Sequence, residues 1–101
     1  PEVAYAAYNV ARESIFNAMR HSSCDSVVMR LEVVSGRLVL EVTDNGVGIS
    51  GSVPGHGRVS MEDRVTAVGG SLEMRERTGE GVSGTFVRAS FPLGADSRGA
   101  R

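Results

Sequence analysis

Apolar and polar positions in the first part of the chain recur with the period of a helix. From Val3 to Ser22 the apolar side chains are spaced by three or four residues, which predicts an amphipathic helix. We expect its buried stripe to consist of Ala4, Tyr8, Ala11, Ile15 and Met19. Glu13, Asn17 and Arg20 have the same spacing and are predicted to lie on the opposite face of this helix.

Two segments with the period of a β-strand follow. Residues 27–34 and 37–43 are apolar at alternate positions, and Ser35-Gly36 separates them. A two-residue link of this kind predicts a tight antiparallel hairpin. We expect the inward-facing side chains to be Met29, Leu31, Val33, Leu38, Leu40 and Val42.

A loop and a second, short helix are predicted next. Residues 46–57 contain five of the thirteen glycines and no apolar period, which predicts a loop. The apolar positions of the short helix are Met61, Val65 and Val68. Gly69-Gly70 is expected to end it, and the capping-box pair Ser60 and Asp63 favours a start one turn after Gly57.

The end of the chain predicts a second hairpin and a tail. Residues 71–77 and 82–93 read as strands around residues 78–81, and residues 94–101 are predicted to be a disordered polar tail. The order of helix, hairpin, loop, helix and hairpin predicts an α+β sandwich with the helices on one face of a sheet. A length of 101 residues suits one compact domain.

Composition excludes several classes of function. A net charge of −1 gives no electrostatic argument for binding nucleic acid or an anionic membrane. No apolar run approaches the ~20 residues of a membrane span, and no signal-peptide pattern precedes the first helix. The single cysteine, Cys24, excludes an internal disulfide and indicates a cytoplasmic setting. Because the first residue is Pro1 rather than Met, we interpret the chain as a segment of a longer protein.

Polar residues on the first helix form the first candidate binding motif. Glu13 and Asn17 are one turn apart, so a carboxylate could orient or deprotonate an attacking group while the neighbouring amide oxygen binds Mg²⁺. Arg20 and His21 follow one turn later and could face phosphate oxygens. Without further context, the same residues also fit a solvated helix face.

Asp44 follows the second predicted strand and begins the second motif. A carboxylate at this place can accept a hydrogen bond from an exocyclic amine such as that of adenine. Gly46 and Gly48 let the backbone approach a ring because they have no Cβ. An Asp-Asn-Gly turn is the alternative interpretation, although the motif Asp44–Gly48 is longer than a turn requires.

Gly55-His56-Gly57 precedes the short helix and forms the third motif. The free amides and the positive end of a helix can hold a phosphate, and the loop before it could close over a nucleotide. A flexible connector with a surface histidine at position 56 explains the same residues equally well.

Three familiar phosphate-binding loops do not fit this chain. Residues 46–53 match the glycine loop of eukaryotic-type protein kinases and part of the dinucleotide-binding fingerprint. All eleven basic residues are arginine, so the lysine that the kinase loop and a Walker P-loop require is missing. The dinucleotide fingerprint needs a helix directly after the glycines, whereas Ser52-Val-Pro-Gly55 follows here. Mg²⁺, arginine, histidine and backbone amides must therefore neutralise the phosphates.

Taken together, the motifs resemble those of the catalytic ATP-binding domain of bacterial sensor histidine kinases, in the superfamily shared with gyrase, Hsp90 and MutL. The matching segments, in chain order, are residues 12–21, 44–48, 55–64 with 68–70, and 84–93. The likeness covers nearly all of residues 3–93 and is nearest to the branch that partners LuxR/NarL-type response regulators.

This resemblance implies a Bergerat-type fold, with a mixed sheet of about five strands backed by about three helices. It implies that Asn17 binds Mg²⁺, that Asp44 binds the adenine amine and that Thr85 supports the adenine end of the site. Glu13 would be the polarising or general-base residue near the γ-phosphate. The implied ATP-binding residues are Asn17, Arg20, His21, Asp44, Gly46, Gly48, Gly55, His56, Gly57 and Thr85. The family transfers this phosphoryl group to a histidine on a separate dimerisation domain, mostly through positioning and charge neutralisation.

The chain also departs from the family pattern. Arg58 replaces a leucine and Ser60 a glycine in the lid box, and the strand that normally precedes the first helix is trimmed at Pro1. No acceptor-histidine helix is present, and His21 belongs to the first box rather than being the phosphorylated histidine.

We therefore predict that residues 1–93 are an ATP-binding catalytic module that acts on its own dimerisation domain and, through it, on a LuxR/NarL-type regulator. Its location is expected to be cytoplasmic, without nucleic acid or direct membrane contact, whether or not the parent protein is membrane-anchored. An anti-sigma-factor serine kinase and a catalytically silent nucleotide-binding module stay open as alternatives.

Overall fold

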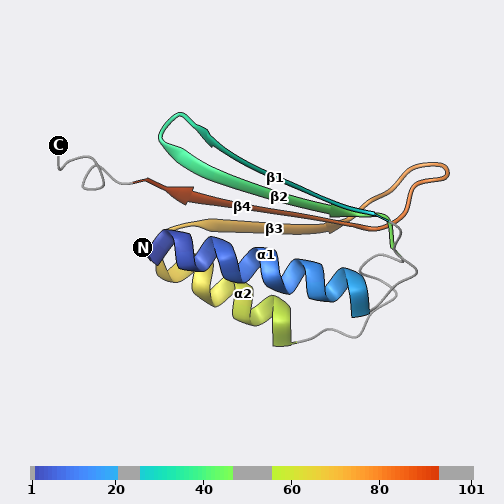
Figure 1. Cartoon of the computed structure of the whole chain (residues 1–101), viewed down its shortest axis with the longest axis horizontal. Helices are drawn as coiled ribbons and strands as arrows, with labels where there is room; N and C mark the ends of the chain where they lie inside the picture. The colour runs from blue at the N-terminus through green and yellow to red at the C-terminus, as the bar shows by residue number, and fades with distance from the viewer. Residues whose placement is uncertain (1, 21–25, 47–55, 94–101) are drawn as a thin grey trace.

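The structure is a computed structural model that describes residues 2–20, 26–46 and 56–93, without the side chains of residues 20 and 56–59. The helices and strands in these residues are α1 (Glu2–Arg20), β1 (Val27–Val34), β2 (Arg37–Asp44), α2 (His56–Ala67), β3 (Ser71–Glu76) and β4 (Thr85–Pro92). Both helices lie on one face of a single sheet (Figure 1). The predicted α+β sandwich and its order of helices and hairpins are therefore confirmed. The described residues form four antiparallel strands and two helices rather than the expected mixed sheet of about five strands and about three helices. Most of the predicted loop, residues 46–57, lies outside the described residues, and its last two residues are helical.

The sheet is antiparallel throughout the described residues, and its strand order is β1-β2-β4-β3. Ser35 and Gly36 join β1 to β2 with φ angles of 51° and 76°. Positive φ at both central positions is what a type I′ turn requires, and this turn matches the twist of the two strands. The predicted first hairpin is confirmed, with Val34 opposite Arg37.

Small residues form the buried face of α1, which differs from the predicted face. The side chains turned toward the core are Ala6, Ala7, Val10, Ser14 and Ala18. The predicted stripe was wrong, because three of its members are exposed (Ala4, Tyr8 and Met19) and two are half-buried (Ala11 and Ile15). Alanine lets a helix approach a sheet closely, so the face with the smaller side chains packs inward and the larger apolar ones lie beside it.

The helix-side face of β1 is largely uncovered. The register places Met29 opposite Val42 and Leu31 opposite Leu40, so these β1 side chains point to the same face as the core. Leu31 and Val33 are nevertheless 60% and 63% exposed, whereas Leu40 and Val42 are each 2% exposed. The predicted direction of the β1 side chains is confirmed. The prediction that these side chains are buried was wrong, because α1 lies mainly over β2 and β4.

Helix α2 packs beside α1 and supplies the rest of the core. Met61 and Val65 are fully buried together with Phe91 of β4. The Ser14 hydroxyl of α1 donates a long hydrogen bond to the Met61 sulfur at 4.0 Å. The predicted start of α2 one turn after Gly57 was wrong, because the helical backbone already begins at His56. Residues 56–60 contain no proline, so nothing in the sequence prevents a helical turn before the capping-box pair Ser60 and Asp63.

A Schellman motif ends α2 at the predicted place. Gly69 has a φ of 79°, its N–H donates to the Thr66 carbonyl, and the Gly70 N–H donates to the Val65 carbonyl, both at 2.9 Å. The left-handed conformation of Gly69 favours glycine, which explains why Gly69-Gly70 is a reliable stop signal.

The second predicted hairpin is confirmed in position, although both strands stop short of the predicted bounds at the turn. Strand β3 ends at Glu76 and β4 begins at Thr85, and β4 pairs with β2 on its other side. The predicted tail, residues 94–101, lies outside the described residues. No helix in the described part of the chain combines the length and the apolar character needed to cross a membrane.

Candidate nucleotide site

The predicted polar residues gather at one end of the sandwich. In Figure 1 the C-terminal ends of α1 and β2 lie at the same end as the N-terminal ends of α2 and β4. Asn17, Asp44 and Thr85 belong to these element ends, and the backbone of His56 and Gly57 begins α2 there. Four segments that are far apart in the sequence therefore converge where the motifs predicted a nucleotide.

Asp44 is the last residue of β2, and backbone donors hold its carboxylate. The residue is 8% exposed. The N–H of Gly46 donates to Oδ1 at 2.9 Å, and the N–H of Thr85 donates to the same oxygen at 3.2 Å. Within the described part of the chain both donors contact Oδ1, which leaves Oδ2 as the oxygen that can accept a hydrogen bond from a ligand. The predicted proximity of Asp44, Gly46 and Thr85 is thus present in the structure.

Asn45 attaches the end of β2 to the residue that precedes β1. Its N–H donates to the Ser26 carbonyl at 3.3 Å, and the Ser26 N–H donates to Asn45 Oδ1 at 3.0 Å. The bond from the Gly46 N–H to Asp44 Oδ1 is the Asx turn of the alternative interpretation. The turn and an acceptor for a base coexist, because the turn uses only one of the two carboxylate oxygens.

Gly84 packs directly against the Asp44 backbone. A Cβ added to Gly84 would lie 1.9 Å from the Asp44 carbonyl oxygen, and the φ of 121° is in the range that favours glycine. This close approach carries the N–H of the next residue, Thr85, to the Asp44 carboxylate. Gly84 was not among the predicted site residues, although it lies directly before one of them.

Arg77, directly after β3, contacts the same carbonyl. Its Nη1 donates to the Asp44 carbonyl at 2.9 Å and to the Ser83 carbonyl at 3.3 Å. Its backbone N–H donates to the Gly84 carbonyl at 2.8 Å. Arg77 was not predicted to belong to the site, because no motif marks a contact between residues 33 positions apart.

Glu13 and Asn17 border the buried face of α1. Both are half-buried, and they precede the buried residues Ser14 and Ala18 directly. The prediction that they lie opposite the buried stripe was wrong, because the true buried stripe is rotated around the helix toward them. Their one-turn spacing on α1 is as predicted, and it places a carboxylate and an amide side by side near the end of α1 that faces the site.

The chemistry of this pair suits Mg²⁺, which prefers oxygen ligands and usually keeps water and phosphate in its coordination shell. Glu13 and Asn17 both offer oxygen donors. Among the residues that the structure describes, no group of three or more His, Cys, Asp or Glu side chains could hold a metal ion.

The structure does not describe every predicted site residue in full. Those outside the described residues are His21, Gly48 and Gly55. Those described by their backbone alone are Arg20, His56 and Gly57, at the end of α1 and the start of α2. Their phosphate and lid roles stay predictions.

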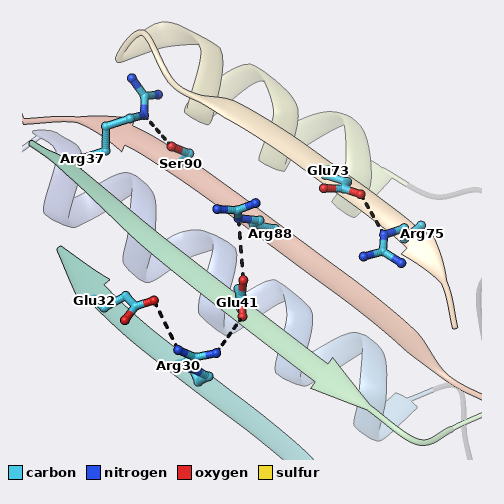
Figure 2. A network of polar contacts seen from close by, with 8 residues as sticks. All are labelled: Arg30, Glu32, Arg37, Glu41, Glu73, Arg75, Arg88 and Ser90. Atoms are coloured by element: carbon cyan, nitrogen blue, oxygen red, sulfur yellow. Dashed lines mark hydrogen bonds and ion pairs between the residues drawn. The ribbon is translucent and has the colours of Figure 1, made fainter. Parts of the chain in front are cut away.

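The face of the sheet turned away from the helices carries paired charges. Figure 2 shows Glu41 on β2 between Arg30 on β1 and Arg88 on β4, with nitrogen–oxygen distances of 3.6 Å to each. The other contacts on this face are Arg30–Glu32 at 3.2 Å, Arg75–Glu73 at 2.7 Å and Arg37–Ser90 at 2.7 Å. Such exposed pairs contribute little to stability, but they engage these arginines on the face opposite the helices.

Comparison with known proteins agrees with this geometry. Residues 3–95 match the family model described as "Histidine kinase-, DNA gyrase B-, and HSP90-like ATPase". The methanol utilization control sensor protein MoxY of Paracoccus denitrificans is 41% identical over 69 residues, which are 61% of this chain and 16% of that protein. Sensor histidine kinase NarS of Mycobacterium tuberculosis is 38% identical over 93 residues, which are 85% of this chain and 21% of that protein.

A solved structure shares the fold. The mycobacterial sensor histidine kinase MprB superposes with a TM-score of 0.68 at 21% sequence identity, over 83% of this chain and 70% of that one. The chain spans only 16% and 21% of the lengths of the two curated relatives.

Proposed function

Because the chain belongs to the histidine kinase-, DNA gyrase B- and HSP90-like ATPase family, we propose that it is the ATP-binding catalytic module of a sensor histidine kinase. Residues 1–93 form the module. The module supplies the γ-phosphoryl group of ATP to a histidine on a dimerisation domain that lies outside this chain. The names of the matched relatives, which include a sensor histidine kinase, support this assignment.

The Asp44 carboxylate is the observation that carries the proposal. It is buried at the end of β2, and backbone N–H groups of Gly46 and Thr85 hold one of its oxygens. Among the described residues the second oxygen has no donor, and we take it as the fixed acceptor for the base. Adenine presents an exocyclic amine donor, whereas guanine presents a carbonyl at the same position, so a fixed acceptor selects adenine. A turn without a ligand would be expected to keep its carboxylate in water, because burial of a charged group is unfavourable.

Residues of α1 and α2 act on the phosphate end of the nucleotide. Asn17 binds Mg²⁺ through its amide oxygen, and the ion, when bound, neutralises charge on the phosphates. Glu13, one turn earlier, orients or deprotonates the attacking group. His56 and Gly57, which begin α2, and Gly55 before them are proposed to bind the phosphates through backbone amides and the positive end of the helix.

The partners follow from the same assignment. The motif resemblance supports a response regulator of the LuxR/NarL type as the final phosphoryl acceptor, reached through the histidine of the dimerisation domain. The module works in the cytoplasm, where ATP and the regulator are available, whether or not its parent is anchored in a membrane.

We propose that the complete domain has a mixed sheet of about five strands backed by about three helices, of which the described residues form four strands and two helices. The uncovered face of β1, with Leu31 and Val33, supports this larger fold. The flank of α1 that carries Ala6 borders α2, so the flank with Ala11 and Ile15 is turned toward β1. A further helix packed between α1 and β1 would bury both apolar surfaces.

Calorimetric titration tests the proposal most directly. The chain, and the longer protein that contains it, are titrated with ADP and with a non-hydrolysable ATP analogue, with and without Mg²⁺. We expect saturable binding that Mg²⁺ strengthens for the ATP analogue. Absence of binding at millimolar nucleotide in both proteins would refute the proposal. Acid stability of the phosphorylated product then separates the kinases, because phosphohistidine is acid-labile and phosphoserine is not.

A further inference from the structure

We infer that Arg77 is a positioning residue for adenine recognition, which fixes the Asp44 backbone and thereby aims the Asp44 carboxylate at the base. This inference rests on the proposed function, because Arg77 acts through Asp44. Arg77 is assigned no contact with the nucleotide. It determines how firmly the group that reads the base is held in place.

The contacts of the Arg77 guanidinium carry the first part of the argument. One nitrogen, Nη1, donates to the Asp44 carbonyl at 2.9 Å and to the Ser83 carbonyl at 3.3 Å. Hydrogen bonds from a charged donor are stronger than those between neutral groups. The side chain is half-buried, which reduces competition from water for the two carbonyls. Arg77 thus joins the end of β2 to the loop that precedes β4.

The strand order explains why this link matters. Strands β2 and β3 are not neighbours, because β4 lies between them. Arg77, directly after β3, therefore reaches past the start of β4 to the end of β2. Gly84 approaches the same Asp44 carbonyl so closely that a Cβ there would lie 1.9 Å from its oxygen. Arg77 and Gly84 together leave the Asp44 carbonyl little freedom to move.

The backbone and side-chain bonds around Asp44 form one connected ring. The Arg77 N–H donates to the Gly84 carbonyl, and the N–H of the following Thr85 donates to Asp44 Oδ1. The ring closes through the bond from Arg77 Nη1 to the Asp44 carbonyl. Removal of the guanidinium therefore loosens the Asp44 backbone and its alignment with the Thr85 donor at the same time, and Oδ2 loses its fixed direction.

Loss of this side chain is expected to leave the fold intact. The β3–β4 ladder extends from the pair Glu76 and Thr85 to the pair Ser71 and Ser90 without using the Arg77 side chain. The end of β2 also keeps its reciprocal bonds between Asn45 and Ser26. The effect should therefore fall on recognition of the base more than on folding.

The test compares two nucleoside diphosphates whose bases differ at the position that the Asp44 carboxylate contacts in the proposed complex. ADP has an exocyclic amine, whereas inosine diphosphate has a carbonyl in its place. Dissociation constants for both are measured by calorimetry on the full-length protein that contains this domain, in the wild type and in Arg77→Met. We expect ADP to bind about tenfold more weakly to the variant and inosine diphosphate to change by less than about twofold, so that the preference for ADP shrinks.

Two further variants sharpen the comparison. Arg75→Met removes the same charge from β3, where Arg75 is exposed, pairs with Glu73 and stacks on Phe86, and it should leave the ADP preference unchanged. Arg77→Lys keeps a cationic donor that can reach backbone carbonyls, and it should restore part of the preference.

The outcomes separate the inference from the proposed function. An equal loss for both diphosphates in Arg77→Met, or no loss for either, would overturn the positioning role while leaving the nucleotide site intact. A lysine variant as impaired as the methionine variant would also count against donation to the carbonyls. A wild type that binds both diphosphates equally would overturn the reading of the base by Asp44, and the role of Arg77 with it.

Discussion

Replacement of Asp44 by Asn exchanges one carboxylate oxygen for an amide donor at the base-reading position. The N–H groups of Gly46 and Thr85 both point at Oδ1. An asparagine must therefore place its oxygen there, since its NH₂ group would otherwise face two donors. The NH₂ group then occupies the Oδ2 position and points at the ligand. The geometry of the site thus fixes which way the amide is oriented.

The cost of this exchange follows from the lost acceptor. The amine of adenine would meet a donor instead of an oxygen, and an unsatisfied buried donor costs about 1–3 kcal/mol. This corresponds to ADP binding that is about 5- to 150-fold weaker. A base with a carbonyl at the same position gains a partner, so GDP should bind more tightly to Asp44→Asn than to the wild type.

Calorimetry with ADP and GDP measures both effects. The matched control is Asp63→Asn, which makes the same chemical change at an exposed position of α2 and should leave both affinities unchanged. Thermal unfolding of each variant separates a loss of recognition from a loss of folded protein. A variant at position 44 that keeps the wild-type ratio of ADP to GDP affinity would refute the role of Asp44 as the adenine acceptor.

Three other substitutions test the remaining parts of the site. Asn17→Ala should abolish Mg²⁺-dependent nucleotide binding; undiminished Mg-ATP affinity in calorimetry would remove the metal assignment. Glu13→Gln should spare nucleotide binding and slow phosphoryl transfer in the full-length protein, and an unchanged transfer rate would reduce Glu13 to a structural residue. Gly84→Ala should lower the free energy of unfolding by about 2–5 kcal/mol in urea denaturation, because its Cβ would lie 1.9 Å from the Asp44 carbonyl oxygen and φ is 121°. Gly81→Ala is its control, since that position has a φ of 73° but no atom within 4 Å, and a similar loss there would show that the close approach is unimportant.

Features encoded by neighbouring residues were predicted correctly from the sequence. Ser35-Gly36 and Gly69-Gly70 are local signals for a hairpin turn and a helix end, and both are present. Met61 and Val65 are buried as their spacing predicted. The motif around Asp44 was also recognisable, because a strand followed by Asp-Asn-Gly is contiguous in the chain, and the family match confirms the resemblance drawn from it.

Features that depend on packing between distant segments were not predictable in this way. The spacing of apolar residues on α1 fits two adjacent faces, and only contact with the sheet selects the one with Val10 rather than the one with Tyr8. The exposure of Leu31 depends on which strands α1 covers. The contacts of Arg77 and Gly84 with the Asp44 carbonyl depend on the strand order, which no local pattern contains.

The position of β1 at the margin of the sheet affects how the separate chain behaves in concentrated solution. In the described part of the chain β1 pairs on one side only, so its other side presents unpaired backbone groups beside exposed Leu31 and Val33. Such a strand can pair laterally with the same strand of a second molecule. The chain should therefore self-associate as its concentration rises, which sedimentation would detect as a growing average mass.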